Sequence, residues 1–193
     1  MSKSFSVAGL VERLGHYSCA EAYRDGLKPT QWSALRYFSR ANRFSRTTTA
    51  FARFQGTSTA AASQTIGALV ERGLLERTAD PLDKRKHLLS LSPAAQSLLD
   101  ADPLRALATA VAVLDEHEQA DLEQKLERML RHLTTQPDGK AFGCCGECRF
   151  LQCRRRAAAG DAVASYRCAH LDEALHSDEI DRLCANFTAV ESG

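Results

Sequence analysis

The sequence predicts a mainly α-helical protein with one two-stranded β-hairpin and a small C-terminal module that is rich in cysteine. Three observations support this prediction. Apolar residues recur at helical spacing through most of residues 1–134. The helical pattern is interrupted at residues 74–92 by two short runs with strand-like alternation on either side of a polar turn. Six of the seven cysteines lie after residue 143.

The composition is that of an ordinary globular protein, with 193 residues, 44% of them hydrophobic and 25% charged. The net charge of +1 means that any basic surface must be local. No stretch approaches the roughly 18 apolar residues that span a membrane, and the N-terminus lacks the apolar run of a secretory signal. We therefore expect a cytoplasmic protein, in which clustered cysteines favour metal binding over disulfides.

The first two predicted helices each have an apolar face. In the first helix this face consists of Val7, Leu10, Val11, Leu14 and Tyr17. The second helix begins near Pro29, and Trp32, Leu35 and Phe38 form its buried stripe.

Capping residues delimit the next two predicted helices. Thr47 is suited to cap a short third helix, and Ser58 to cap a fourth. The fourth helix directs Ile66, Leu69 and Val70 inward and ends at Gly73.

Two short strands are predicted next, at about Leu75–Thr78 and Lys86–Leu91, with the polar tip ADPLDKR between them. Ser92 followed by proline is a strong helix start. Pro103 should kink or split that helix, and a last helix is expected from about Glu118.

Helix, turn, helix and then a hairpin with a basic tip is the plan of a winged helix-turn-helix, a fold that binds duplex DNA. A recognition helix must present small or polar side chains to the major groove, and Ser58, Thr59, Ser63 and Gln64 meet this requirement. A wing contacts phosphates or a neighbouring groove through cations, and the predicted tip carries Lys84, Arg85 and Lys86. Close helix packing and a solvated turn are the alternative interpretations of these two features.

The segment LVERGLLERTADPLDKRKHLLSLSPAAQSLL resembles the end of the recognition helix and the wing of MarR-type transcriptional regulators. The matching positions are Leu69, Gly73, Leu74, Arg77, Asp83, Arg85, Leu91 and Ser92. The segment LKPTQWSALRYF is similar to the second helix of that family, and the resemblance covers about residues 7–134. The chain departs from the family pattern after the wing, where Pro93 and two alanines replace the usual glycine.

The resemblance implies a homodimer in which the first helix and the last two pair across a two-fold axis. Two recognition helices about one DNA turn apart would then bind a pseudo-palindromic operator in double-stranded DNA. It also implies a regulator and not an enzyme, which agrees with the lack of a cofactor fingerprint such as G-x-G-x-x-G.

The C-terminal region carries the cysteines that could bind a metal. Cys145 and Cys148 form a C-x-x-C knuckle, in which a two-residue gap lets both sulfurs grip one metal ion. Cys168 and Cys184 follow singly, and the six tail cysteines allow several sets of four ligands. Two further candidate metal ligands are Cys144 and Cys153. A module this small buries little core, so a metal would supply folding free energy.

Both an iron–sulfur cluster and zinc suit all-thiolate ligation. One knuckle with dispersed single cysteines favours an iron–sulfur cluster, and zinc is the alternative. The tail also resembles the extension F-G-x-C-x-x-C…C…C of a subset of MarR-like regulators. Its matching positions are Phe142, Gly143, Cys145, Cys148, Cys168 and Cys184. The resemblance thus implies that the four cysteines among them are the favoured ligand set.

We therefore expect a winged helix-turn-helix and dimerisation domain at 1–134 and a metal-binding extension at 135–193. The predicted function is that of a homodimeric DNA-binding regulator whose iron–sulfur cluster senses redox state or iron. The alternative is a repressor that responds to a small-molecule effector, with structural zinc in the tail. A cluster-dependent electron-transfer enzyme and an interaction module without DNA affinity are weaker alternatives.

Overall fold

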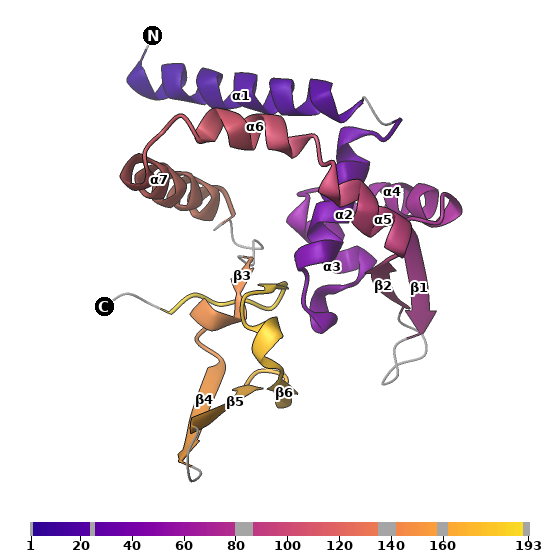
Figure 1. The fold of residues 1–193 in the computed structure, drawn as a ribbon, viewed down its shortest axis with the longest axis vertical. Helices are drawn as coiled ribbons and strands as arrows, with labels where there is room; N and C mark the ends of the chain where they lie inside the picture. Colours follow the sequence, from indigo (N-terminus) through magenta and orange to yellow (C-terminus); the bar gives the residue numbers. More distant parts are fainter. Residues whose placement is uncertain (1, 24–25, 80–86, 135–141, 158–161, 191–193) are drawn as a thin grey trace. The chain divides into compact units, whose positions relative to one another are not determined.

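The helices and the hairpin of the first 134 residues follow one another in the predicted order. The structure is a computed structural model, and it describes residues 2–23, 26–79, 87–134, 142–157 and 162–190. Its elements up to residue 134 are α1 (Lys3–Ala22), α2 (Pro29–Arg40), η1 (Arg43–Ser45), α3 (Thr48–Phe54), α4 (Thr59–Glu71), β1 (Leu75–Ala79), β2 (His87–Leu91), α5 (Pro93–Asp100), α6 (Leu104–Val111) and α7 (Glu116–Thr134) (Figure 1). The predicted mainly helical fold class with a small hairpin is confirmed for this part of the chain.

Side-chain caps explain where three of these helices begin. The hydroxyl oxygens of Thr47, Ser58 and Ser92 each accept a hydrogen bond, at 3.2 Å, from the backbone N–H three residues later. Gly73 has a φ of +67°, the left-handed conformation that ends α4. Pro103 separates α5 from α6, as the sequence predicted.

The C-terminal region contains short strands that the sequence analysis did not anticipate. Its elements are β3 (Gly143–Cys144), η2 (Cys145–Glu147), β4 (Leu151–Ala157), β5 (Ala162–Cys168), β6 (Glu173–Leu175), η3 (Ser177–Glu179) and β7 (Leu183–Cys184). Strands β4, β5 and β6 form an antiparallel sheet in that order, and β3 pairs with β7. The two- and three-residue strands β3, β6 and β7 leave no periodic pattern, and the seven-residue strands β4 and β5, rich in arginine and alanine, lack a clear alternation of apolar and polar residues.

Contacts divide the chain into two compact units. The first comprises Met1–Ser39, Ser63–Glu76 and Ser90–Met129, and the second comprises Arg40–Ala62, Arg77–Leu89 and Leu130–Gly193. The second unit thus holds the cysteine-rich tail together with η1, α3 and the first residues of α4. The boundary expected at residue 134 stays a prediction.

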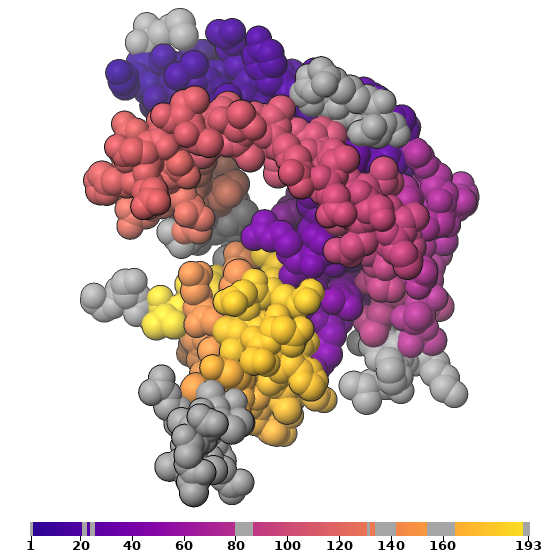
Figure 2. Space-filling model, in the orientation of Figure 1, coloured from indigo at the N-terminus to yellow at the C-terminus, as the bar shows by residue number. Residues whose placement is uncertain are grey.

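In the first unit, α1 lies along α6 (Figure 2). The most buried side chains of this unit include Leu27, Trp32, Leu35, Phe38, Ile66, Leu69 and Leu75. Much of the apolar face of α1 is exposed, including Leu10 and Leu14. Within the described residues, no helix combines the length and the apolar character needed to cross a membrane.

Candidate functional site

Helix α4 has the two-sided character that the sequence predicted. Ile66 and Leu69 are fully buried, whereas Thr59, Ser63 and Gln64 are exposed. Ser58, the exposed cap, precedes the first turn of the helix. These small polar side chains are therefore accessible, as a DNA-reading helix requires. The predicted wing residues Lys84, Arg85 and Lys86 lie outside the described residues.

In the second unit, the four favoured cysteines belong to one packed cluster, which we call the cysteine cluster. Its buried members are Cys145, Leu175, Cys184 and Phe187, against which Phe44, Cys148, Leu151, Tyr166 and Cys168 pack. Cys144 and Cys153 are not members of it. The Cys144 thiol donates to the carbonyl of Asp181 at 3.3 Å, and Cys153 is exposed on β4.

Backbone pairing explains how cysteines so far apart in sequence come together. Gly143 pairs with Cys184 across β3 and β7, and Leu151 pairs with Cys168 across β4 and β5. The N–H of Cys148 donates to the carbonyl of Cys145 at 3.1 Å and closes the knuckle. In Figure 2 the orange segment that carries the knuckle lies against the yellow segment that follows β6.

Cys145 and Cys184 interact directly through their side chains. The hydrogen bond with Cys184, together with burial, raises the pKa of Cys145 far above its ordinary value. The hydrogen bond from Cys145 lowers the pKa of Cys184 to about 6, against the effect of burial; the backbone of Asn186 and the side chains of Asn42 and Ser45 also lower it. The pair therefore holds one thiolate readily, and its environment supplies donors to sulfur, as metal–thiolate sites do.

The chemistry of the donor set fits a thiophilic metal centre. Four cysteine thiols from the knuckle, β5 and β7 share one cluster, which is shielded by Phe44 and Phe187. Among the described residues, no group of three or more His, Cys, Asp or Glu side chains is placed to hold a metal ion as they stand. Ligation by the four thiols would therefore require side chains of the cysteine cluster to reorient.

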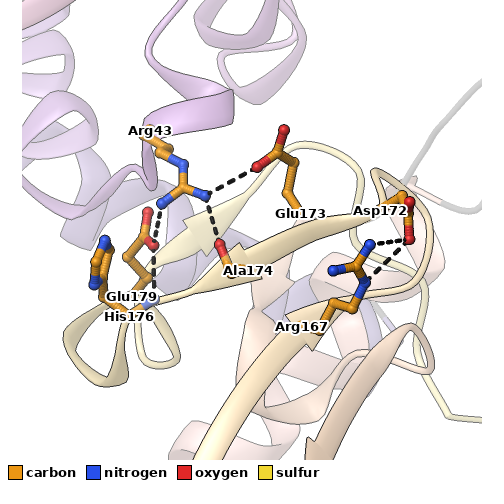
Figure 3. A network of polar contacts seen from close by, with 7 residues as sticks. All are labelled: Arg43, Arg167, Asp172, Glu173, Ala174, His176 and Glu179. Atoms are coloured by element: carbon orange, nitrogen blue, oxygen red, sulfur yellow. Dashed lines mark hydrogen bonds and ion pairs between the residues drawn. The ribbon is translucent and has the colours of Figure 1, made fainter.

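The segment that precedes α3 contacts the tail through several side chains. Arg43 donates to the Glu179 carboxylate at 2.8 Å and to the carbonyl of Ala174 at 2.5 Å, and it lies 3.7 Å from the carboxylate of Glu173 (Figure 3). Glu179 also accepts from the backbone N–H of His176 at 3.0 Å. The tail is thus attached to the helix-turn-helix segment by hydrogen bonds and ion pairs.

The next helix adds further contacts. Arg53 of α3 donates to the carbonyl of Ala185 at 3.3 Å, and its guanidinium lies 5.6 Å from the ring centroid of Phe142. Phe54 meets the same ring edge to face, with the centroids 5.3 Å apart. The start of the tail therefore packs on α3.

Sequence reasoning did not find the contribution of Asn42, Phe44 and Ser45 to the cysteine cluster. Asn42 and Ser45 are fully buried polar residues in a short connecting segment. Buried polar residues in a connection between helices need partners, but nothing in the sequence indicated that the partners lie about a hundred residues later.

Comparison with known proteins supports the fold of the helix-turn-helix part. Residues 25–86 match the MarR family. A probable transcriptional regulator from Pseudomonas aeruginosa is 29% identical, with a TM-score of 0.52, over 64% of this chain and 96% of that one. No curated protein matches the chain.

Two structures from Staphylococcus aureus share the fold at 18% identity. The MepR–DNA complex has a TM-score of 0.55 over 68% of this chain and 98% of that one. MepR, a transcription regulator of the multidrug efflux pump MepA, has a TM-score of 0.53 over 69% and 99% of the two chains. These matches leave about a third of the present chain without a counterpart.

Proposed function

We propose that this chain, whose residues 25–86 match the MarR family, is a homodimeric DNA-binding transcriptional regulator that holds an iron–sulfur cluster on Cys145, Cys148, Cys168 and Cys184. MarR-family proteins are transcription regulators and not enzymes, which agrees with the prediction that this chain is not an enzyme. The iron–sulfur cluster would report the redox state or the supply of iron.

Binding to double-stranded DNA is supported by α4 and by the comparisons. The exposed face of α4 carries Thr59, Ser63 and Gln64, which can hydrogen-bond to base edges or phosphates. A protein of the same fold, MepR, has been crystallised with DNA. The cations at Lys84, Arg85 and Lys86 would add phosphate contacts and make the affinity depend on salt.

Assembly as a homodimer is supported by exposed apolar side chains on the terminal helices of the helix-turn-helix part. On α1, Phe5 and Tyr17 are 67% and 68% exposed, and on α7, Leu130 and Leu133 are 60% and 69% exposed. Large apolar side chains grouped on helices commonly mark a protein interface. A second copy of the chain would cover them and place two α4 helices on a pseudo-palindromic operator.

The observation that carries the metal proposal is the gathering of four cysteines in one cluster. An iron–sulfur cluster supplies one-electron redox chemistry when bound. Cys145, Cys148, Cys168 and Cys184 would ligate the metal, while Asn42 and Ser45 donate hydrogen bonds to the buried sulfurs. Phe44 and Phe187 would exclude water.

Structural zinc is the second candidate, because four thiolates suit zinc equally well. In that case the tail would be a folding element, and a small-molecule effector would regulate DNA binding.

One preparation tests both levels of the proposal. Protein purified without oxygen is analysed for iron, acid-labile sulfide and zinc, and its affinity for duplex DNA is measured at several salt concentrations. A broad visible absorption band with iron and sulfide supports the cluster, and colourless protein with zinc supports the alternative. A DNA affinity that does not change with salt concentration would contradict the proposal that this chain binds DNA phosphates. Equal DNA affinities with and without metal would mean that the metal has only a structural role.

A further inference from the structure

Asn42 joins the cysteine cluster to the helix-turn-helix through both its side chain and its backbone. Its Nδ2 donates to the Cys145 Sγ at 3.4 Å, and its backbone N–H donates to the carbonyl of Leu183 at 2.9 Å. The side chain also hydrogen-bonds to Cys184. Asn42 is fully buried, so these contacts form away from water and have no solvent substitute.

The orientation of the Asn42 amide is adapted to sulfur. Buried amides ordinarily use both their N–H and their carbonyl groups. Here the Oδ1 atom has no hydrogen-bond partner within the part of the chain that the structure describes. A thiolate accepts hydrogen bonds and repels a carbonyl oxygen, so metal-bound Cys145 would hold Nδ2 in place. Without that thiolate, only the hydrogen bond to Cys184 offsets the cost of the unpaired Oδ1.

A continuous set of hydrogen bonds runs from Asn42 to α3. The carbonyl of Asn42 accepts from the N–H of Ser45 at 3.0 Å, and the carbonyl of Ser45 accepts from the N–H of Thr47 at 2.8 Å. Thr47 caps α3, and the hydroxyl of Ser45 accepts from the N–H of Ala185 at 2.8 Å. The start of α3 is therefore fixed by groups that are themselves fixed by the cysteine cluster.

A tight turn connects α3 to α4. The N–H of Thr57 donates to the carbonyl of Ala52 at 3.0 Å, and Ser58 caps α4. The first residues of α4 belong to the same compact unit as Asn42 and the tail. A change at the cysteine cluster can thus reach the first turn of α4 through a short series of hydrogen bonds.

We propose that Asn42 is a positioning residue that transmits the state of the metal centre to α3 and to the start of α4. This proposal rests on the proposed function, since it requires a metal on the cysteines. With metal bound, the Asn42 amide is held by sulfur and orders η1 and α3. Loss of the metal releases the amide, loosens residues 43–54 and changes the affinity for DNA.

The test is the isosteric substitution Asn42→Leu, which removes the donor to sulfur and the unpaired Oδ1 together. Wild-type and variant protein are compared with and without metal by amide hydrogen exchange, and by affinity for a duplex that the wild-type protein selects from random sequence. In the wild type, metal removal should speed exchange at residues 43–54 by about five- to tenfold, as expected for the loss of one hydrogen bond. In the variant, the exchange rates of residues 43–54 in the metal-bound and metal-free states should differ by less than about twofold.

The midpoint reduction potential of the iron–sulfur cluster is a second measurement, and a purely structural role of Asn42 would not change it. Hydrogen bonds to sulfur favour the more negative, reduced form of an iron–sulfur cluster. The variant should therefore keep its iron and have a more negative midpoint potential. Lys125→Gln is the control, because Lys125 pairs with exposed Asp121 on α7 and neither residue neighbours a proposed ligand in sequence.

The outcomes separate the two proposals. If the wild type binds neither iron nor zinc, the proposed metal centre and the proposed role of Asn42 are both overturned. If the wild type binds metal but Asn42→Leu retains the full difference between its metal-bound and metal-free states, the role of Asn42 alone is overturned. If the variant does not fold, the wild-type exchange data still decide, because unchanged exchange at residues 43–54 on metal removal overturns the transmission.

Discussion

Arg43 in η1 donates to the carboxylate of Glu179 in η3 at 2.8 Å, and the Glu179 side chain is only 8% exposed (Figure 3). We predict that Arg43→Gln weakens the attachment of the tail to the helix-turn-helix segment. The substitution leaves a buried carboxylate without its cation, and breaking such pairs is costly. Because the Arg43 side chain is 35% exposed, water can replace part of the interaction, and we expect a loss of ~1–3 kcal/mol. Chemical denaturation followed by tail-specific hydrogen exchange measures it.

The control for Arg43 is Arg167→Gln. Arg167 also pairs with a carboxylate, that of Asp172, but the two side chains are 47% and 85% exposed. Exposed pairs contribute little, so the stability should change by less than ~1 kcal/mol. Equal effects of the two substitutions would mean that burial of Glu179 does not matter.

Asp102 gives the first unit a pH-dependent contact. The Nε and a terminal nitrogen of Arg36 donate to its two carboxylate oxygens at 2.7 and 2.5 Å, and the backbone N–H of Leu104 donates to it at 2.8 Å. Burial raises the pKa of Asp102, but the hydrogen bonds from Arg36 and Leu104 outweigh it and hold the pKa below the ordinary 3.8.

The substitution Asp102→Asn should therefore lower the free energy of unfolding by ~1–2 kcal/mol at pH 7, as expected for a partly buried ion pair with two hydrogen bonds. A carboxylate whose pKa is lowered by folding stabilises the protein fully above its unfolded pKa. That stabilisation is lost as the pH falls through the lower folded value. The difference in unfolding free energy between wild type and variant should stay constant from pH 7 to about pH 5 and shrink below pH 4. Asp121→Asn, which removes an exposed pair with Lys125, is the control for the loss of one carboxylate from the surface.

Sequence patterns predicted the helices and their caps better than they predicted the tail. Thr47, Ser58, Ser92 and Pro103 act locally, so the sequence revealed their roles. The inward direction of Ile66 and Leu69 followed from helical periodicity, which extends over many residues.

The partners of the tail could not be predicted in this way. Asn42 and Cys145 lie 103 positions apart, and no local pattern encodes a pairing at that distance. The knuckle did identify Cys145 and Cys148 as a pair, and the membership of Cys168 and Cys184 in the same cluster agrees with the favoured set. Whether these four bind metal stays a prediction.

Gly143 allows close packing beside the cysteine cluster. A Cβ added at this position would lie 2.7 Å from ring atoms of Phe187, which is itself buried in the cluster. We predict that Gly143→Ala displaces Phe187 and destabilises the pairing of β3 with β7 by ~1–3 kcal/mol. Faster amide exchange of Cys144 and Leu183 would report it. Gly15→Ala is the control, because nothing lies within 4 Å of its added Cβ and alanine favours a helix interior.

A negative charge on the exposed face of α4 should weaken DNA binding. Ser63 is exposed on α4, so Ser63→Glu should leave the helix intact while repelling phosphates. We expect about a tenfold loss of affinity or more for duplex DNA, the scale of one lost phosphate or base contact. Ser97→Glu adds the same charge at an exposed position of α5 and corrects for the change in net charge. Similar losses in both variants would mean that α4 does not contact the DNA.

Cys148 and Cys153 distinguish ligation by the cysteine cluster from adventitious binding to thiols. Cys148 packs against the cluster, whereas Cys153 is exposed on β4 outside it. We predict that Cys148→Ser removes most of the bound iron or zinc, because a serine hydroxyl is a poor ligand for a thiophilic metal. The helix-turn-helix part should still fold, and far-ultraviolet circular dichroism measures its helix content. Cys153→Ser should retain the metal, and elemental analysis of the two variants prepared side by side gives the comparison. Metal retained in Cys148→Ser would remove Cys148 from the ligand set and point to Cys144 as the next candidate, and metal lost equally from both variants would indicate adventitious binding to thiols.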